Sequence, residues 1–333
     1  MPLATLDEIR DLLICPRCRS PLTARPGTLR CRAADCPYGA PSGFPTAGRR
    51  PVLVDFERSA VTREEVAAAA PGPARRLPAA LRRAWKPRNR VAVRNADLLL
   101  GGLGGAPVVL VVGGATVGNG VDAVYREPGV RVVAFDLAPS PVTQFVADAH
   151  RIPLAAASVD AVVVQAVLEH VLDPAAVVAE IHRVLTADGL VYAETPFLQQ
   201  VHAGPLDFTR FTASGHRRLF GRFEEIAAGP VAGPGTQLLW SVDHLVRGVT
   251  RSASAGRVAR GLCCWLRALD RLVPEDYARD SASALYFLGR RREREMTDRE
   301  VVAYYRGAQT SARGARSART IAASPDRRSV AGR

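Results

Sequence analysis

The sequence has almost no lysine: Lys86 is the only one among the 45 basic residues of this 333-residue chain. The other basic residues are arginines, a bias that matches the codon composition of a GC-rich genome. Residues 290–333 contain 12 arginines and 5 acidic residues, so the tail supplies +7 of the net charge of +13. A solvated, largely disordered basic tail over 291–333 explains the charge better than a dedicated nucleic-acid-binding arm.

The sequence also lacks long apolar runs. No uninterrupted apolar stretch reaches about 18 residues, so we expect no transmembrane helix. The first 14 residues carry acids and no apolar segment of the signal-peptide kind, so a cytoplasmic location is the default expectation. Hydrophobic residues nevertheless make up 47% of the chain. This proportion excludes a disordered protein and allows one large domain with additions.

Cysteine is scarce, but four of the six cysteines lie close together in the pattern C-x2-C-x12-C-x4-C: Cys15, Cys18, Cys31 and Cys36. Two pairs on short turns suit tetrahedral zinc, which would replace the core that so small a segment cannot build. The alternative is a set of ordinary or disulfide-bonded cysteines, which a reducing compartment disfavours. We therefore predict a structural zinc site.

The central nucleotide-binding candidate is the stretch 108–136. Residues 108–112 are uniformly apolar and predict a buried parallel strand. Four glycines follow, where the backbone can take positive φ and a ligand can approach closely: Gly113, Gly114, Gly118 and Gly120. A helix is expected at about 119–126, and then a second strand at 131–135 that ends in Asp136. In such a unit the loop and the helix N-terminus bind the polar linker of a nucleotide, and the acid accepts hydrogen bonds from ribose hydroxyls.

Strands and helices alternate downstream, which predicts a doubly wound α/β sheet. Asp173 and Pro174 predict a helix start, and Gly189 its stop. Further strands are expected at 145–147, 158–164, 190–194, 223–228 and 284–288. Two apolar-faced helices, within about 236–273, interrupt the sheet before its last strand. They form a lid, a dimer surface or a membrane-facing patch, and we favour a packed lid.

A polar and aromatic loop at 197–212 leaves the carboxyl end of the fifth strand, where α/β proteins bind ligands. It carries three substrate-site and catalytic candidates within nine residues: His202, Asp207 and Arg210. His202 is the candidate general base. The alternative is a substrate lid, or a loop held together by an Asp207–Arg210 pair.

The cysteine segment resembles known zinc ribbons. LLICPRCRSPL, the two later cysteines, Gly43-Phe44-Pro45 and RPVLVD are similar to the small zinc-ribbon activators of methyltransferases and to ribbons fused to some ribosomal guanine methyltransferases. The resemblance implies a structural zinc and an adaptor or substrate-recognition role.

The stretch 108–290 resembles the class I S-adenosylmethionine-dependent methyltransferases of the type 11 group. The resemblance is carried by VVGGATVGNG, VVAFD, FVADAHRIPLAAASVDAVVVQAVLEHVLDP and EIHRVLTADGLVYAETP, and by ALYFLG as a closing antiparallel strand. It implies S-adenosylmethionine as cofactor, with Asp136 on the ribose and residues 165–170 beside the active site. It also implies further cofactor-binding residues, on the methionine part, near the adenine and at the strand end: Gly113, Gly114, Ala115, Gly118, Asp148, Ala149 and Gln165.

We therefore predict four segments: a zinc-ribbon module at 1–58, a helical linker at 59–107 with short helices near 64–70, 77–85 and 89–100, a class I methyltransferase domain at 108–290, and the tail. The expected activity is methyl transfer to a small-molecule or glycan-type acceptor. The first alternative is an rRNA or tRNA methyltransferase that uses the ribbon for recognition, although no Asn/Asp-Pro-Pro-Tyr motif stands at 165–167. The others are a nicotinamide-dependent oxidoreductase, since Gly113-x-Ala115-x-x-Gly118 fits a dinucleotide fingerprint variant, and a non-catalytic binding module. The oligomeric state stays open.

Overall fold

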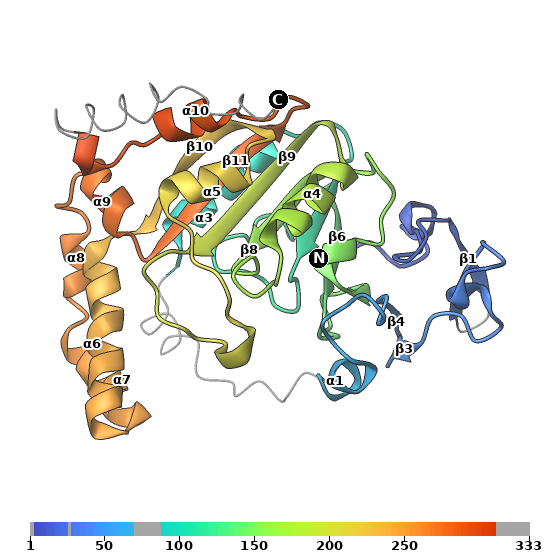
Figure 1. Ribbon diagram of the computed structural model, residues 1–333, viewed down its shortest axis with the longest axis horizontal. Helices are drawn as coiled ribbons and strands as arrows, with labels where there is room; N and C mark the ends of the chain where they lie inside the picture. Colours follow the sequence, from blue (N-terminus) through green and yellow to red (C-terminus); the bar gives the residue numbers. More distant parts are fainter. Residues whose placement is uncertain (1–2, 26–27, 70–87, 311–333) are drawn as a thin grey trace, which may run out of the picture.

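The computed structural model describes residues 3–25, 28–69 and 88–310 (Figure 1). The helix expected at 77–85 and the tail from residue 311 lie outside the described residues. A nine-stranded sheet runs through the centre of the molecule. Across the sheet the strands are β10 (Phe223–Ala232), β11 (Ala284–Arg291), β9 (Leu185–Pro196), β8 (Val159–Gln165), β5 (Val108–Val112), β6 (Arg131–Asp136), β7 (Phe145–Ala147), β4 (Arg50–Leu53) and β3 (Thr46–Ala47).

The six strands from β9 to β4 are parallel, whereas β11 is antiparallel to both β9 and β10. Strands β5 and β8 pair with each other in the middle of the sheet, and the direction in which successive strands are added reverses between them. This reversal is the topological switch point at which open α/β sheets bind ligands. The structure confirms the predicted α/β class, and it confirms a closing antiparallel strand.

The helices of the described residues cover both faces of the sheet or stand beside it (Figure 1). They are α1 (Arg63–Ala68), α3 (Arg90–Gly101), α4 (Pro174–Val184), α5 (Ala213–Leu219), α6 (Pro234–Thr250), α7 (Ala253–Leu262), α8 (Leu266–Leu269), α9 (Glu275–Ser281) and α10 (Asp298–Ala303). Strand β5 shows how the two faces divide. Val109 and Val111 pack in one cluster with α3, and Leu110 packs in the other with α4. All five β5 residues are buried, as a parallel central strand requires.

The N-terminal segment is part of the same body. Its hairpin of β1 (Leu22–Arg25) and β2 (Thr28–Cys31) stands apart from the large sheet, but β4 pairs in parallel with β7 and extends that sheet. Ile14 N donates to Pro153 O at 3.0 Å, and Ala155 N donates to Leu12 O at 2.8 Å. The apolar core of the segment is continuous with that of the sheet. The four-segment division stays a prediction, but the segment is not a separately tethered module.

Two local expectations differ from the structure. Residues 119–126 form turns instead of a helix, because Gly120 has a φ of +96° and its backbone approaches Asn89 O closely. Gly189 does not stop the helix at 174–184, which ends when Leu185 turns extended and begins β9. The helix predicted near 89–100 is confirmed as α3, which packs on the sheet.

The predicted helical insertion between β10 and β11 forms α6 to α9, which stand at one end of the molecule in Figure 1. Asp270 accepts hydrogen bonds from Gly235 N (2.7 Å) and from Thr236, and so closes the N-terminus of α6 against the end of α8. Much of the expected apolar face remains exposed, including Leu245, Leu262 and Trp265. A lid role for these helices stays a prediction.

Candidate functional site

The glycine loop follows β5 at the switch point, where Val167 and Gln165 lie directly against it. Gly113 has a φ of +72°, and a Cβ added there would lie 2.2 Å from Val167 Cγ2. A Cβ on Gly118 would lie 2.0 Å from Gln165 Oε1. Gly114 N donates to Phe135 O at 2.8 Å, which binds the loop to the end of β6. These glycines are thus required by backbone conformation and by close packing.

Asp136 ends β6 beside this loop. Its Oδ2 accepts a hydrogen bond from Ala115 N, and its Oδ1 accepts one from Ala138 N, both at 3.0 Å. The residue is only partly buried, and each carboxylate oxygen can accept a further hydrogen bond. Asp136 can therefore both hold the loop and receive hydroxyl donors from a ligand.

Asp148 follows β7 and caps the short helix η3 (Ala149–Arg151). His150 Nδ1 lies 2.7 Å from Asp148 Oδ1, and Ser59 Oγ donates to Oδ2. Burial alone would raise the pKa of Asp148, but the hydrogen bonds from His150 and Ser59 outweigh it and lower that pKa. The next residue, Ala149, is also buried. Asp148 is an ionised, well-anchored acid at the third strand end.

Glu194, near the end of β9, was missed in the sequence and lies at the centre of a buried polar network. Its carboxylate accepts from Gln165 Nε2 at 2.6 Å, from Asn89 Nδ2 at 3.0 Å and from the Tyr192 hydroxyl. Burial raises the pKa of Glu194. Gln165 Nε2 also donates to Asn119 O at 3.2 Å. The predicted site residue Gln165 is thus held rigidly against the glycine loop.

The loop at 197–212 brings the three catalytic candidates together. Arg210 pairs with Asp207 through both guanidinium branches, one of them at 2.9 Å, and Arg210 Nε donates to Gln199 O at 3.0 Å. Asp207 Oδ2 accepts from His202 N at 2.9 Å. The hydrogen bonds from Arg210 hold the pKa of the Asp207 carboxyl well below its usual range. Asp207 and Arg210 therefore organise the loop, and His202 is the member of the three that is free for chemistry.

Glu169 lies where the loop after β8 meets the 197–212 loop, and it was not singled out in the sequence. The residue is fully buried, and neither carboxylate oxygen has a hydrogen-bond partner among the residues that the structure describes. His170 Nε2 lies 3.7 Å and His202 Nε2 3.9 Å from Glu169 Oε1. Burial raises the pKa of Glu169 to about 7. The sequence signal was the Leu-Glu-His order directly after a strand.

The backbone ahead of this cluster is in an unusual conformation. Ala166 follows the last residue of β8 and has a φ of +56°, a backbone conformation that residues other than glycine rarely adopt. Its N–H donates to Glu194 O at 3.0 Å, which stabilises the turn. The turn directs the 167–170 segment across the ligand-binding edge of the sheet.

The four predicted zinc ligands converge. All four thiol sulfurs lie within 4.8 Å of one another, with Cys15 and Cys36 sulfurs 3.7 Å apart and Cys18 and Cys31 sulfurs 3.3 Å apart. Tetrahedral zinc at its usual bond length places sulfurs about 3.8 Å apart. The cysteines are not disulfide-bonded. The donor set therefore fits zinc.

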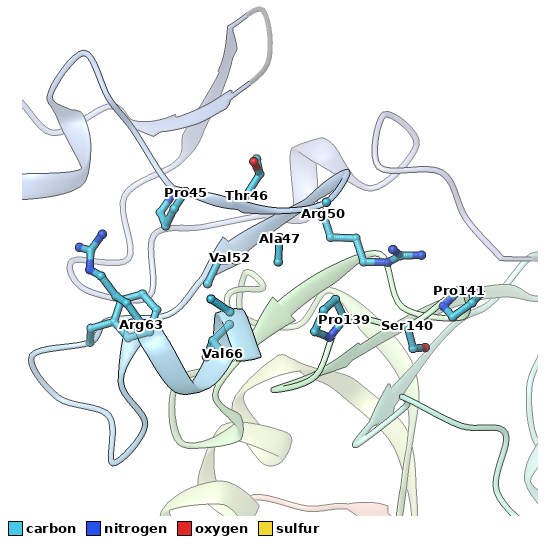
Figure 2. Close-up of a pocket in the computed structure, with 13 residues that line it drawn as sticks. Pro45, Thr46, Ala47, Arg50, Val52, Arg63, Val66, Pro139, Ser140 and Pro141 are labelled. Carbon is cyan, nitrogen blue, oxygen red and sulfur yellow. The ribbon is translucent and has the colours of Figure 1, made fainter. Parts of the chain in front are cut away.

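A separate hollow of about 650 Å³ lies between the β3–β4 edge, α1 and the loop after β6 (Figure 2). Arg50 and Arg63 stand on opposite sides of it in Figure 2, and Pro139 and Ser140 face it from the loop. Arg50 Nε donates to Thr143 O at 2.7 Å, and Arg63 lies over the Phe56 ring. None of the predicted cofactor or catalytic residues lines this hollow.

The sequence of residues 113–193 matches the model of a protein family described as a methyltransferase domain. This segment is therefore similar to a methyltransferase domain. It contains the glycine loop, Asp136, Asp148, Gln165 and the Glu169–His170 pair, and it ends within β9. The order and directions of the strands around it agree with the assignment, since β11 closes the sheet antiparallel to β9, a strand that the dinucleotide dehydrogenase fold lacks.

Solved methyltransferase structures resemble the chain at low sequence identity. A protein of Galdieria sulphuraria described as a sarcosine dimethylglycine methyltransferase is 15% identical, with 61% of this chain and 86% of that chain covered and a TM-score of 0.41. A chain in the complex of the Haloferax volcanii Trm112 methyltransferase activator with a methyltransferase is 16% identical, with 61% and 92% covered and a TM-score of 0.41.

A third structure is the Burkholderia thailandensis 1,6-didemethyltoxoflavin-N1-methyltransferase, which is 17% identical, with 64% and 83% covered and a TM-score of 0.38. No curated protein sequence matches the chain. The assignment of the methyltransferase domain rests on the family match. None of the described helices is long and apolar enough to cross a membrane.

Proposed function

We propose that the protein transfers a methyl group from S-adenosylmethionine to a small-molecule or glycan-type acceptor. The observation that carries the proposal is the family match over 113–193, which covers the glycine loop and both strand-end acids at the switch point. Bound S-adenosylmethionine would supply an electrophilic methyl group on a sulfonium. The rest of the chemistry is positioning by this chain.

The residues present fit that cofactor. Asp136 is a partly exposed strand-end carboxylate that keeps acceptor capacity after binding two backbone N–H groups, so it suits ribose hydroxyls. Gly113 and Gly118 let the loop pack closely against Val167 and Gln165, and Gln165 is fixed beside them by Glu194. Asp148 and Ala149 end the neighbouring strand, where the adenine is expected.

His202 is the residue that would remove a proton from the acceptor. Its side chain is 37% exposed, and its backbone is fixed by Asp207, so an acceptor can reach it. In this proposal Asp207 and Arg210 position His202 and do not touch the acceptor. The ribbon would act as a structural element with zinc on its four cysteines.

The test is isothermal titration of the zinc-loaded protein with S-adenosylmethionine, S-adenosylhomocysteine and NAD. We expect micromolar binding of the two sulfur compounds, equivalent to about 8 kcal/mol, and loss of this binding in Asp136→Ala. Asp97→Ala, which removes an exposed acid from α3, is the matched control and should bind normally. Binding of NAD alone would instead identify an oxidoreductase, and silence from all three ligands would identify a non-catalytic module.

The RNA alternative is separated by a second titration. An RNA methyltransferase would bind structured RNA with an affinity that falls steeply as salt rises, because phosphate contacts release counterions. We expect no binding of this kind at physiological salt. Micromolar binding at that salt would replace the small-molecule acceptor with RNA and leave the cofactor assignment intact.

A further inference from the structure

The cluster of Glu169, His170 and His202 combines two imidazoles with one buried carboxylate at the ligand-binding edge of the sheet. One ligand atom from each residue lies within 4.8 Å of the other two. The histidines come from different loops, since His170 follows β8 and His202 follows β9. The loops are joined by the main chain, because Phe208 N donates to Glu169 O at 2.8 Å. The cluster is therefore a product of the fold and not of sequence neighbours alone.

The hydrogen bonds of the two histidines direct one nitrogen of each toward Glu169. His170 Nδ1 lies 2.7 Å from Leu206 O, so Nδ1 carries the proton and Nε2 keeps its lone pair. His202 Nδ1 lies 3.4 Å from both Gln200 O and Asp207 Oδ2, which favours the same tautomer. A carbonyl or carboxylate behind one ring nitrogen, with the other nitrogen bare, is the usual arrangement of metal-binding histidines.

Glu169 supplies the second, independent observation. Its side chain is 1% exposed, and both oxygens lack a hydrogen-bond partner among the described residues. A buried carboxyl group without partners is costly, and a cation would satisfy it. Arg210, whose charge also acts on Glu169, is already bonded to Asp207 and to three backbone carbonyls.

We infer that Glu169, His170 and His202 form a binding site for one divalent first-row transition-metal ion of the Mn²⁺ to Zn²⁺ series. Two imidazoles disfavour Mg²⁺ and Ca²⁺, which prefer oxygen ligands throughout. The separations of 3.7 and 3.9 Å from Glu169 Oε1 are slightly longer than the roughly 3.4 Å expected for tetrahedral ligands. The His202 side chain is 37% exposed, so it is the less tightly enclosed of the ligands.

Three protein ligands leave positions open on the metal, and the exposed edges of His170 and His202 place those positions toward solvent. A metal with open positions binds oxygen donors. If the proposed function holds, on which this step rests, the acceptor is a hydroxyl- or phosphate-bearing molecule that is oriented by the metal. With its Nε2 on the metal, His202 orients the acceptor through the metal and does not take its proton, so a bound metal replaces the base role of His202. The metal site itself is independent of the proposed function.

The test is a Co²⁺ titration of the full-length, zinc-loaded protein, followed by visible absorption and calorimetry. We expect one equivalent of Co²⁺ to bind and to show the weak visible absorption bands of cobalt with nitrogen and oxygen ligands. A strong thiolate charge-transfer band would show instead that cobalt had entered the cysteine site. If that band appeared and no second equivalent of Co²⁺ bound, the proposal would be overturned. Absence of binding by the wild-type protein would overturn it as well.

Variants locate the site. Glu169→Gln and His202→Gln should each weaken Co²⁺ binding by at least about tenfold. His182→Gln is the matched control, because His182 lies near the end of α4 and bonds to Arg292 O, and it should bind cobalt as the wild type does. Equal binding by all of these proteins would place the metal elsewhere and refute the assignment.

Titration with S-adenosylmethionine in the same proteins separates the two proposals. Normal cofactor binding without a cobalt site would refute the metal site and leave the proposed function intact. A cobalt site without cofactor binding would do the reverse.

Discussion

His216 gives the protein a pH-dependent stability that can be worked out from its surroundings. The side chain is 3% exposed on α5, with the Phe220 ring centroid 5.1 Å away, and its Nε2 has no hydrogen-bond partner among the described residues. Burial lowers the pKa of His216 to about 3. The folded protein therefore keeps this imidazole neutral across the physiological range.

The sign follows from the two pKa values. An unfolded chain has a histidine pKa of about 6.5 and takes up a proton below that pH, which the folded protein cannot do until about pH 3. The contribution to stability is therefore complete above pH 6.5 and is lost as the pH falls toward 3. At pH 5.0 the unfolded state gains RT ln(1 + 10^1.5), or about 2 kcal/mol, from this proton.

The perturbation is His216→Phe, which keeps an aromatic ring in a pocket already lined by Phe220 and Phe287 and removes the titrating group. The assay is urea unfolding of both proteins at pH 7.5 and pH 5.0. Other titrating groups are common to both, so the wild type should lose about 2 kcal/mol more than the variant between the two pH values. His244→Phe, on the partly exposed side of α6, should behave as the wild type does. Equal losses in the wild type and in His216→Phe would refute the reasoning.

Three further predictions concern the cysteine site, the glycine loop and the interface of the ribbon. Cys15→Ser should abolish zinc retention, measured by metal analysis. It should also lower the melting temperature of the whole protein, because Cys15 is buried in the core that the ribbon shares with the sheet. An unchanged melting temperature after zinc loss would contradict a common core. Gly113→Ala should lower the free energy of unfolding by about 1–2 kcal/mol because of the φ of +72° alone, and a clash with Val167 adds to this loss. It should also reduce S-adenosylmethionine affinity in calorimetry. Gly104→Ala, where a side chain would meet open space, should change neither quantity. Arg19→Ala should cost less than about 1 kcal/mol in urea unfolding despite its 3.1 Å pair with Glu180, because Arg19 is 60% exposed; a larger loss would show that the ion pair, and not apolar burial, holds the ribbon on the sheet.

The local sequence determined the elements that need only near neighbours. The uniformly apolar run at 108–112 gave a buried central strand, and the Asp173-Pro174 pair started α4. The acid that ends β6 and the acid that follows β7 lie at the ligand-binding edge. The four cysteines converge as their spacing predicted. Hydrophobic periodicity, capping and metal-ligand spacing act over a few residues, so they can be recognised in a sequence.

Tertiary structure alone decided the contacts between distant segments. Strand β4 joined the sheet beside β7, and the turn at 119–126 replaced a helix because Asn89 O approaches Gly120. Glu169 and His202 are 33 positions apart and meet only because the loops after β8 and β9 leave the same edge of the sheet. Glu194 gained its partners in the same way, from Asn89 at the N-cap of α3 and from Gln165 of β8. Such contacts depend on strand order and loop paths, and these are set by the packing of the whole core and not by any short stretch of residues.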